Sequence, residues 1–268
     1  MVSPLRAISR IAAYLTWTGL LIPVQFVALK LGLGLSVRLP KFYHRVCSRI
    51  FGFEIRIHGE IEIEGPVLFA CNHTSYTDIT ILGSLLPASF VAKAEVAGWP
   101  LFGVLAKLQR TVFVDRRGSR AARQRDEMVE RLEKGDSLIL FPEGTSSDGN
   151  AVLPFKSALF SVAQFRPQDR PLRVQPISIA YTRLDGMPIG RALRPYFAWY
   201  GDMLLAPHFW DMAGLGNVTV DIVCHPVVTL EAFGSRKALA EHCFRAIAEG
   251  VAVANAGRLD ALPVPAAA

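Results

Sequence analysis

The sequence predicts an α/β fold with a mixed, largely parallel central sheet flanked by helices, preceded by an N-terminal membrane-anchoring helical segment. Three observations support this fold class. After residue 52, short runs of β-branched or aliphatic residues alternate with helical stretches, as in α/β domains. Several of these runs are apolar throughout, which is expected of strands covered on both faces. Before residue 52, a long uncharged run stands between basic residues.

The uncharged run covers residues 11–29 and is long enough to cross the hydrocarbon core of a bilayer, which is about 30 Å thick. A signal peptide and a buried helix of a soluble protein are the alternatives. No small-residue cleavage pattern follows the run, and Trp17 and Pro23 suit an anchor better than a processed leader. The basic flanks also favour an anchor, so we expect a helix that spans or re-enters the membrane.

Residues 40–51 predict a second helix with an apolar and a basic face. The apolar set comprises Phe42, Tyr43, Val46, Cys47, Ile50 and Phe51. The polar set comprises Lys41, His44, Arg45, Ser48 and Arg49. Such a helix could lie in the lipid headgroup layer. It could equally pack on its own domain, and the segment alone does not separate these alternatives.

The charge and the cysteines indicate partners and location. Residues 1–56 hold eight Lys or Arg against one acid, Glu54, so we expect anionic membrane lipids as partners. We expect no nucleic acid, because no groove-reading or base-stacking motif accompanies the charge. The four cysteines are scattered without CxxC pairs, which indicates neither a zinc site nor a disulfide framework. We therefore expect the inner (cytoplasmic) membrane, with the main domain facing the reducing cytoplasm.

The expected organisation is an anchor and interfacial helix over 1–52, one domain over 53–256 and a disordered tail over 257–268. The predicted strands are 54–58, 66–71, 89–93, 111–114, 137–141, 174–180 and 218–224. The predicted helices are 76–86, 99–107, 119–134, 155–165 and 234–254. Pro154 suits the first turn of the fourth helix. Residues 183–217 lack clear periodicity and are expected to form a lid or membrane-facing insertion.

The sharpest motif is NHTSYTD at 72–78, directly after the apolar run that ends at Cys71. Residues five apart lie about 140° apart on an ideal helix, so His73 and Asp78 cannot both sit mid-helix and touch. If His73 lies in the turn before the helix, Asp78 can fold back onto the imidazole. A carboxylate on one ring nitrogen fixes the tautomer and leaves the other nitrogen as a general base. The alternative is ordinary helix-capping chemistry.

Two further motifs follow apolar runs. In FPEGT at 141–145, Glu143 could accept hydrogen bonds from a polyol, and Gly144 would let the backbone approach a ligand. The alternative is a tight turn, which needs the proline and the glycine for its geometry alone. Lys156 could add a phosphate contact, but a lone lysine is more often a solvated group. Arg116, the first of five arginines in 116–125, is the preferred headgroup contact because a guanidinium binds phosphate through two bonds.

These motifs, in this order, resemble the glycerophospholipid acyltransferase family, whose best-known members are the 1-acyl-glycerol-3-phosphate (lysophosphatidate) acyltransferases. The resemblance covers residues 66–181. It implies that His73 and Asp78 are the catalytic pair. It also implies that the acceptor's glycerol and phosphate are bound by Arg116, Glu143, Gly144 and Thr145. Ser157 departs from the glycine that the family pattern leads us to expect after Lys156.

The resemblance implies transfer of a fatty acyl chain from acyl carrier protein or acyl-coenzyme A to the hydroxyl of a lysolipid, with lysophosphatidate as the first choice of acceptor and phosphatidate as the product. The aromatic tract at 199–210 is similar to bacterial lyso-lipid acyltransferases, including the ornithine-lipid branch, so lyso-ornithine lipid or another lysophospholipid is the alternative.

We expect no cofactor, because the thioester is already activated, and no metal ion, because His73 and Asp78 lack further ligands at metal-site spacing. A hydrophobic groove for the acyl chain is expected beside 11–29 and 40–51. A catalytically silent lipid-binding protein and a hydrolase of lipid esters are the competing functions.

Overall fold

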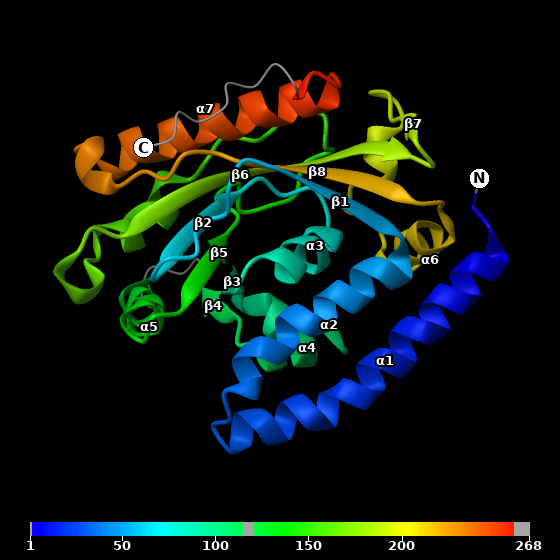
Figure 1. The fold of residues 1–268 in the computed structure, drawn as a ribbon, viewed down its shortest axis with the longest axis horizontal. Helices are drawn as coiled ribbons and strands as arrows, with labels where there is room; N and C mark the ends of the chain where they lie inside the picture. Colours follow the sequence, from blue (N-terminus) through cyan, green and yellow to red (C-terminus); the bar gives the residue numbers. More distant parts are fainter. Residues whose placement is uncertain (1, 115–120, 260–268) are drawn as a thin grey trace.

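The structure, a computed structural model, describes residues 2–114 and 121–259. Its centre is a mixed, largely parallel sheet with the strand order β1-β8-β6-β2-β5-β3-β4, and β7 pairs with β6 (Figure 1). Within the described chain, β6 runs antiparallel to β7 and β8, and the other pairs are parallel. The predicted fold class is confirmed. The strands are β1 Phe53–His58, β2 Val67–Cys71, β3 Ala88–Lys93, β4 Val112–Val114, β5 Ser137–Leu140, β6 Arg173–Leu184, β7 Met187–Pro188 and β8 Val218–Cys224.

Helices cover both faces of this sheet. The helices are α1 Pro4–Lys30, α2 Leu35–Phe51, α3 Thr77–Leu85, α4 Phe102–Leu108, α5 Ala121–Glu133, α6 Leu205–Gly214 and α7 Arg236–Asn255. Alternate residues of a strand point to opposite faces. Phe69 of β2 therefore packs in the cluster that contains residues of α1, α2 and α3, whereas Leu68 and Ala70 pack in the cluster that contains residues of α5 and α7. Figure 1 shows α7 along one face of the sheet and α2 and α3 on the other.

All seven predicted strands are present, and one predicted α-helix needs correction. Residues 155–165 do not form an α-helix: a 3-10 helix runs over Ser157–Gln164, so Pro154 lies before its first turn. The physical reason is that the Lys156 amide donates to the Pro142 carbonyl (2.9 Å), which holds this stretch extended against the preceding turn. The predicted insertion at 183–217 contains the end of β6, β7 and helix α6, which packs on α1.

Helix α1 is long and apolar enough to cross a membrane, and 22% of its most apolar 18-residue window is buried against the rest of the protein. Tyr14 lies on the buried side, and the centroid of its ring is 5.4 Å from that of Phe51 in α2 and 5.8 Å from that of Phe209 in α6. The remaining surface exposes large apolar side chains, among them Leu5, Leu20 and Phe26. Helix α1 therefore exposes apolar side chains, and it runs along the outside of the domain (Figure 1).

The predicted faces of the second helix are wrong in part. In α2, His44 and Ser48 are buried and Phe42 is half exposed. His44 packs against Gly83 of α3, and its Nε2 lies 2.9 Å from Oε1 of Gln109. Burial lowers the pKa of His44 to about 4, so the ring is neutral. The reason for the difference is Gly83, which has no side chain and lets an imidazole fill the space between α2 and α3. Helix α2 thus packs on its own domain, the second alternative given above.

This contact predicts that Gly83→Ala lowers stability. A Cβ at Gly83 would lie 2.6 Å from Cδ2 of His44, whose ring is held by Gln109 and cannot easily move. Overpacking of this kind costs about 1–3 kcal/mol. We expect a melting temperature several degrees lower for the purified protein in detergent. Gly19→Ala in α1 is the control, because its Cβ would meet nothing within 4 Å. Equal melting temperatures for the two variants would contradict the packing described here.

Candidate active site

The motif residues lie at one edge of the sheet. Strands β2, β3 and β5 are parallel, and Ala70 of β2 pairs with Leu140 of β5, so the segments that follow β2 and β5 are neighbours. His73 stands two residues after β2, and Phe141 comes directly after β5. The imidazole stacks on the Phe141 ring, with centroids 4.2 Å apart and an interplanar angle of 19°. This edge of a parallel sheet is where α/β proteins usually bind ligands.

His73 lies in the turn before α3, and Asp78 lies in the first turn of that helix. Nδ1 of His73 is 2.8 Å from Oδ2 of Asp78, so the chain folds back in the way the spacing predicts. The carboxylate is fully buried, whereas the imidazole is 22% exposed. The amides of Thr74 and Ser75 donate to the same Oδ2 at 2.6 and 2.9 Å. The Tyr181 hydroxyl donates to Oδ1 at 2.6 Å.

These contacts determine the protonation of the pair. The backbone amides and the tyrosine hydroxyl supply protons to both carboxylate oxygens, which is the environment of an ionised aspartate. Nδ1 of His73 must then be the donor in its bond to Asp78. In the neutral ring, Nε2 is left as an unprotonated acceptor. Since His73 lines a cavity, the site offers a base to a molecule bound there.

Tyr181 holds the buried face of Asp78. Burial and the charge of Asp78 keep the pKa of Tyr181 well above its ordinary value, so the hydroxyl retains its proton. Because that proton goes to Asp78, the Thr77 hydroxyl, 2.6 Å away, donates to the Tyr181 oxygen. Asn72 ties the same region to β6, since its side-chain amide makes reciprocal bonds of 2.8 and 3.0 Å with the backbone of Ile179.

Glu143 is placed differently from the expectation. Its carboxylate accepts hydrogen bonds from the backbone amides of His73 (2.6 Å) and Leu153 (2.8 Å), and it lies behind the cavity wall. Burial raises the pKa of Glu143 to about 7; the two amide bonds oppose this shift, and the charge of Asp78 adds to it. In this geometry Glu143 positions the His73 backbone, and its contact with the acceptor stays a prediction. Turn geometry alone, the alternative considered above, does not describe it.

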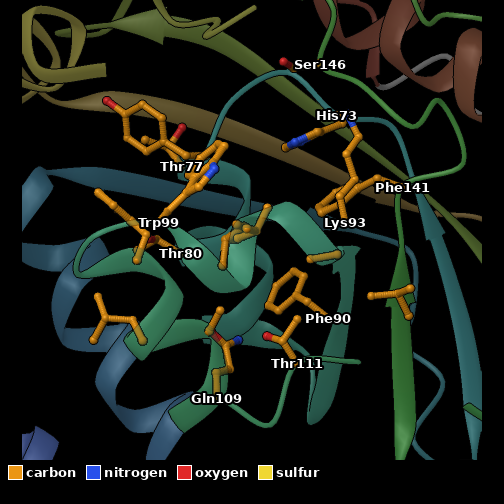
Figure 2. A pocket seen from close by; sticks show the side chains of 18 of the residues that line it. His73, Thr77, Thr80, Phe90, Lys93, Trp99, Gln109, Thr111, Phe141 and Ser146 are labelled. Atoms are coloured by element: carbon orange, nitrogen blue, oxygen red, sulfur yellow. The ribbon is translucent and has the colours of Figure 1, made fainter. Parts of the chain in front are cut away.

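A cavity of about 870 Å³ contains the remaining predicted side chains. Gly144, Thr145 and Lys156 line it together with His73. Gly144 has a φ of +67°, and a Cβ there would lie 2.7 Å from Nζ of Lys156, so only glycine lets the lysine pack against this turn. Figure 2 shows the imidazole at one end of the cavity and Gln109 and Thr111 at the other. Arg116 lies outside the residues that the structure describes.

Side chains of the N-terminal helices form part of the same wall. Thr18 and Ile22 of α1 and Tyr43 of α2 line the cavity. The wall is largely apolar, and it includes Phe90 and Leu105 from β3 and α4. An apolar cavity therefore lies beside 11–29 and 40–51, where the sequence predicts a hydrophobic groove, and its use by the acyl chain stays a prediction.

Sequence reasoning missed Tyr181, Thr77 and the direction of Glu143. Tyr181 ends the apolar run of β6, about a hundred residues from Asp78, and nothing local marks it as a partner. The one available signal was a tyrosine, with its polar hydroxyl, at the end of a buried apolar run. It indicates a buried hydroxyl, which needs a hydrogen-bond partner, but not which partner.

Comparisons with known proteins identify the family. A family model described as Acyltransferase matches residues 54–180. A lyso-ornithine lipid O-acyltransferase of Brucella abortus is 44% identical over 244 residues, which cover 90% of this chain and 91% of that protein. A 1-acyl-sn-glycerol-3-phosphate acyltransferase of Neisseria gonorrhoeae is 34% identical over 161 residues, 59% of each protein. The crystal structure of the 1-acyl-sn-glycerophosphate (LPA) acyltransferase from Thermotoga maritima has a TM-score of 0.62 at 20% identity, over 96% of this chain and 99% of that chain.

The fold, the histidine and aspartate at the carboxyl edge of its sheet, and these matches define an O-acyltransferase. The chain belongs to the glycerophospholipid acyltransferase family. The resemblance inferred from the motifs is confirmed, and so is the predicted enzyme class. The likeness to the Thermotoga maritima structure concerns the fold alone.

The raised pKa of Glu143 predicts a stability that depends on pH. This carboxyl has an ordinary pKa of 4.5 and a pKa of about 7 in the folded protein. Between these values the folded state binds more protons than the unfolded state, so the contribution of Glu143 to stability decreases as pH rises and is constant above about 7. We expect the melting temperature of the wild type to fall across this interval relative to that of Glu143→Gln, which has no proton to lose.

The control for this measurement is Glu130→Gln. Glu130 is an exposed carboxylate of α5 paired with Lys134, and the pKa of Glu130 is lowered by that hydrogen bond and charge. Glu130→Gln should leave the dependence of the melting temperature on pH as in the wild type between pH 5 and 7. The reason is that the Glu130 carboxylate is already ionised there in both the folded and the unfolded protein. Parallel profiles for the wild type and Glu143→Gln would contradict the burial of Glu143.

Proposed function

We propose that this enzyme transfers a fatty acyl chain to the hydroxyl of a lyso-ornithine lipid. The observation that carries the proposal is the extent of the likeness to proteins of that name. The Brucella abortus relative is matched over 91% of its length, and a Rhizobium meliloti relative of the same name, 41% identical, over 76%. These matches extend well beyond the 54–180 segment that the general family model covers. These matches thus favour lyso-ornithine lipid, the alternative acceptor in the sequence analysis, over lysophosphatidate.

Lysophosphatidate is the second candidate acceptor. The Neisseria gonorrhoeae relative named for that activity is matched over 59% of its length. Lys156 lines the cavity near His73 and would suit an anionic headgroup.

We propose acyl carrier protein or acyl-coenzyme A as the donor, since both are anionic and the chain has a formal net charge of +6.

The proposed mechanism is general base catalysis by His73. The acceptor hydroxyl gives its proton to Nε2 of His73 as its oxygen bonds to the thioester carbonyl carbon. Asp78 stabilises the imidazolium through Nδ1. The tetrahedral intermediate then expels the thiolate, which takes the proton from Nε2 to leave as a thiol, and the ester remains. General base catalysis of this kind contributes about 10² to 10⁴ in rate. The bonds and protons of this transfer balance with the protein and its two substrates alone.

We further propose that the enzyme lies on the cytoplasmic face of the inner membrane. The apolar exposed surface of α1 suits contact with lipid, and the cavity that contains His73 is lined in part by that helix. A lysolipid could then enter from the bilayer without crossing water. Basic residues flank the helix at both ends, and all four cysteines are buried free thiols, which agrees with a reducing compartment.

An acyl-transfer assay tests this proposal. Purified enzyme is incubated with a labelled acyl thioester of carrier protein or coenzyme A and with lyso-ornithine lipid, lysophosphatidate and other lysolipids. We expect the highest kcat/KM for lyso-ornithine lipid. His73→Ala should lower kcat about 10² to 10⁴-fold for every acceptor that the wild type uses, because the base is lost. His242→Ala is the control, since His242 lies on α7 and does not line the cavity.

Each competing function gives a different result. Full transfer by His73→Ala would contradict the proposed base. Absence of acyl transfer by the wild type, together with intact biological function in His73→Ala, would indicate a lipid-binding protein. Release of free fatty acid without an acceptor would indicate a hydrolase. Transfer to lysophosphatidate alone would replace the proposed acceptor with the second candidate.

A further inference from the structure

Three aromatic rings meet beside the base, and the mechanism above does not use them. The Trp99 and Trp199 ring centroids are 5.9 Å apart at an interplanar angle of 86°. The centroids of Tyr76 and Trp199 are 6.0 Å apart at 67°. All three side chains line the cavity that contains His73. We call Tyr76, Trp99 and Trp199 the aromatic corner. Figure 2 shows Trp99 across the cavity from Phe141, with His73 at the end between them.

The aromatic corner is held in place by the site itself. The Trp199 amide donates to the Thr74 carbonyl at 3.0 Å, and its indole Nε1 donates to the Met203 carbonyl at 2.9 Å. The Tyr76 hydroxyl bonds to Nδ1 of His208 at 3.0 Å. The polar edges of these two rings are therefore already engaged. The rings nevertheless line the cavity, and Trp99 is 39% exposed.

The charges of the cavity wall are unequal. Among its described residues, Lys93 and Lys156 are cationic, and none is an aspartate or glutamate. An ammonium group bound there would therefore find no carboxylate on the described wall. The face of an indole or phenol ring is a favourable partner for a cation, and that of tryptophan is the strongest. The Lys156 side, against Gly144, suits a carboxylate or phosphate instead.

We propose that the aromatic corner binds the primary ammonium group of a zwitterionic amino-acid headgroup, and so selects acceptors that carry a cation. This inference rests on the proposed lyso-ornithine lipid acceptor, whose headgroup bears both an ammonium and a carboxylate. The carboxylate would face Lys156, and the ammonium would face the rings. A phosphate headgroup gains nothing from ring faces, which carry the negative part of the aromatic quadrupole. The corner thereby acts on acceptor specificity, and the proton transfer at His73 is separate from it.

The test compares a charged and a neutral acceptor in each variant. The acceptors are lyso-ornithine lipid and the same lipid acetylated on its side-chain amine, which keeps the hydroxyl and the chain but loses the cation. In the wild type we expect kcat/KM for the charged acceptor to exceed that for the neutral one by about 3- to 30-fold, mainly through KM, which is the range of cation–π contacts in partly desolvated sites. In Trp99→Leu this ratio should approach one, and Trp99→Phe should keep part of it.

The readout is the ratio of the two kcat/KM values measured on the same protein. Partial unfolding of a variant lowers both activities equally and leaves this ratio unchanged. Val104→Ala is the control variant, because Val104 is exposed on neighbouring α4 and does not line the cavity; its ratio should equal that of the wild type. An unchanged ratio in Trp99→Leu, or a wild-type ratio of one, would overturn the aromatic corner alone. A wild type that acylates lysophosphatidate and not lyso-ornithine lipid would overturn the proposed acceptor and this inference together.

Discussion

The buried carboxylate of Asp78 is the interaction on which the site depends. Taking a carboxylate out of water is costly unless donors surround it. Here the donors come from two backbone amides of its own turn, from Tyr181 on β6, and from the imidazole of His73. One charge thus joins the β2–α3 turn, the neighbouring strand and the base. Because each contact satisfies the same carboxylate, the position of the imidazole is determined by the fold as a whole.

The sheet and its helices place this site beside the two N-terminal helices. The parallel strands bring the segments after β2 and β5 to one edge, where Phe141 and the Glu143 carboxylate fix His73 from two sides. The cavity runs from that edge past apolar side chains toward α1 and α2. Helix α1, which exposes several large apolar side chains, belongs to the wall of the cavity that contains His73. A single arrangement places a polar base at one end of an apolar space and a lipid-compatible surface beside it.

Much of this architecture could be predicted from the sequence, because local pattern decides it. The strands are short apolar runs, and the contact of His73 with Asp78 follows from the geometry of a turn that enters a helix. The partners of Asp78 and Glu143 could not be predicted in the same way, since Tyr181 and Leu153 are brought to them by sheet pairing and loop folding. The buried side of α2 was misjudged because a glycine on another helix, not the α2 sequence, makes room for His44.

The tautomer of His73 tests the central claim most directly. Nitrogen-15 NMR of histidine-labelled enzyme, with the His73 signals assigned by their loss in His73→Gln, distinguishes the two neutral forms of the ring. The arrangement around Asp78 predicts a proton on Nδ1 and none on Nε2 in the neutral ring, and a mixture of both forms in Asp78→Asn. A wild-type imidazole with its proton on Nε2 would contradict the account, because no lone pair would then face the acceptor hydroxyl.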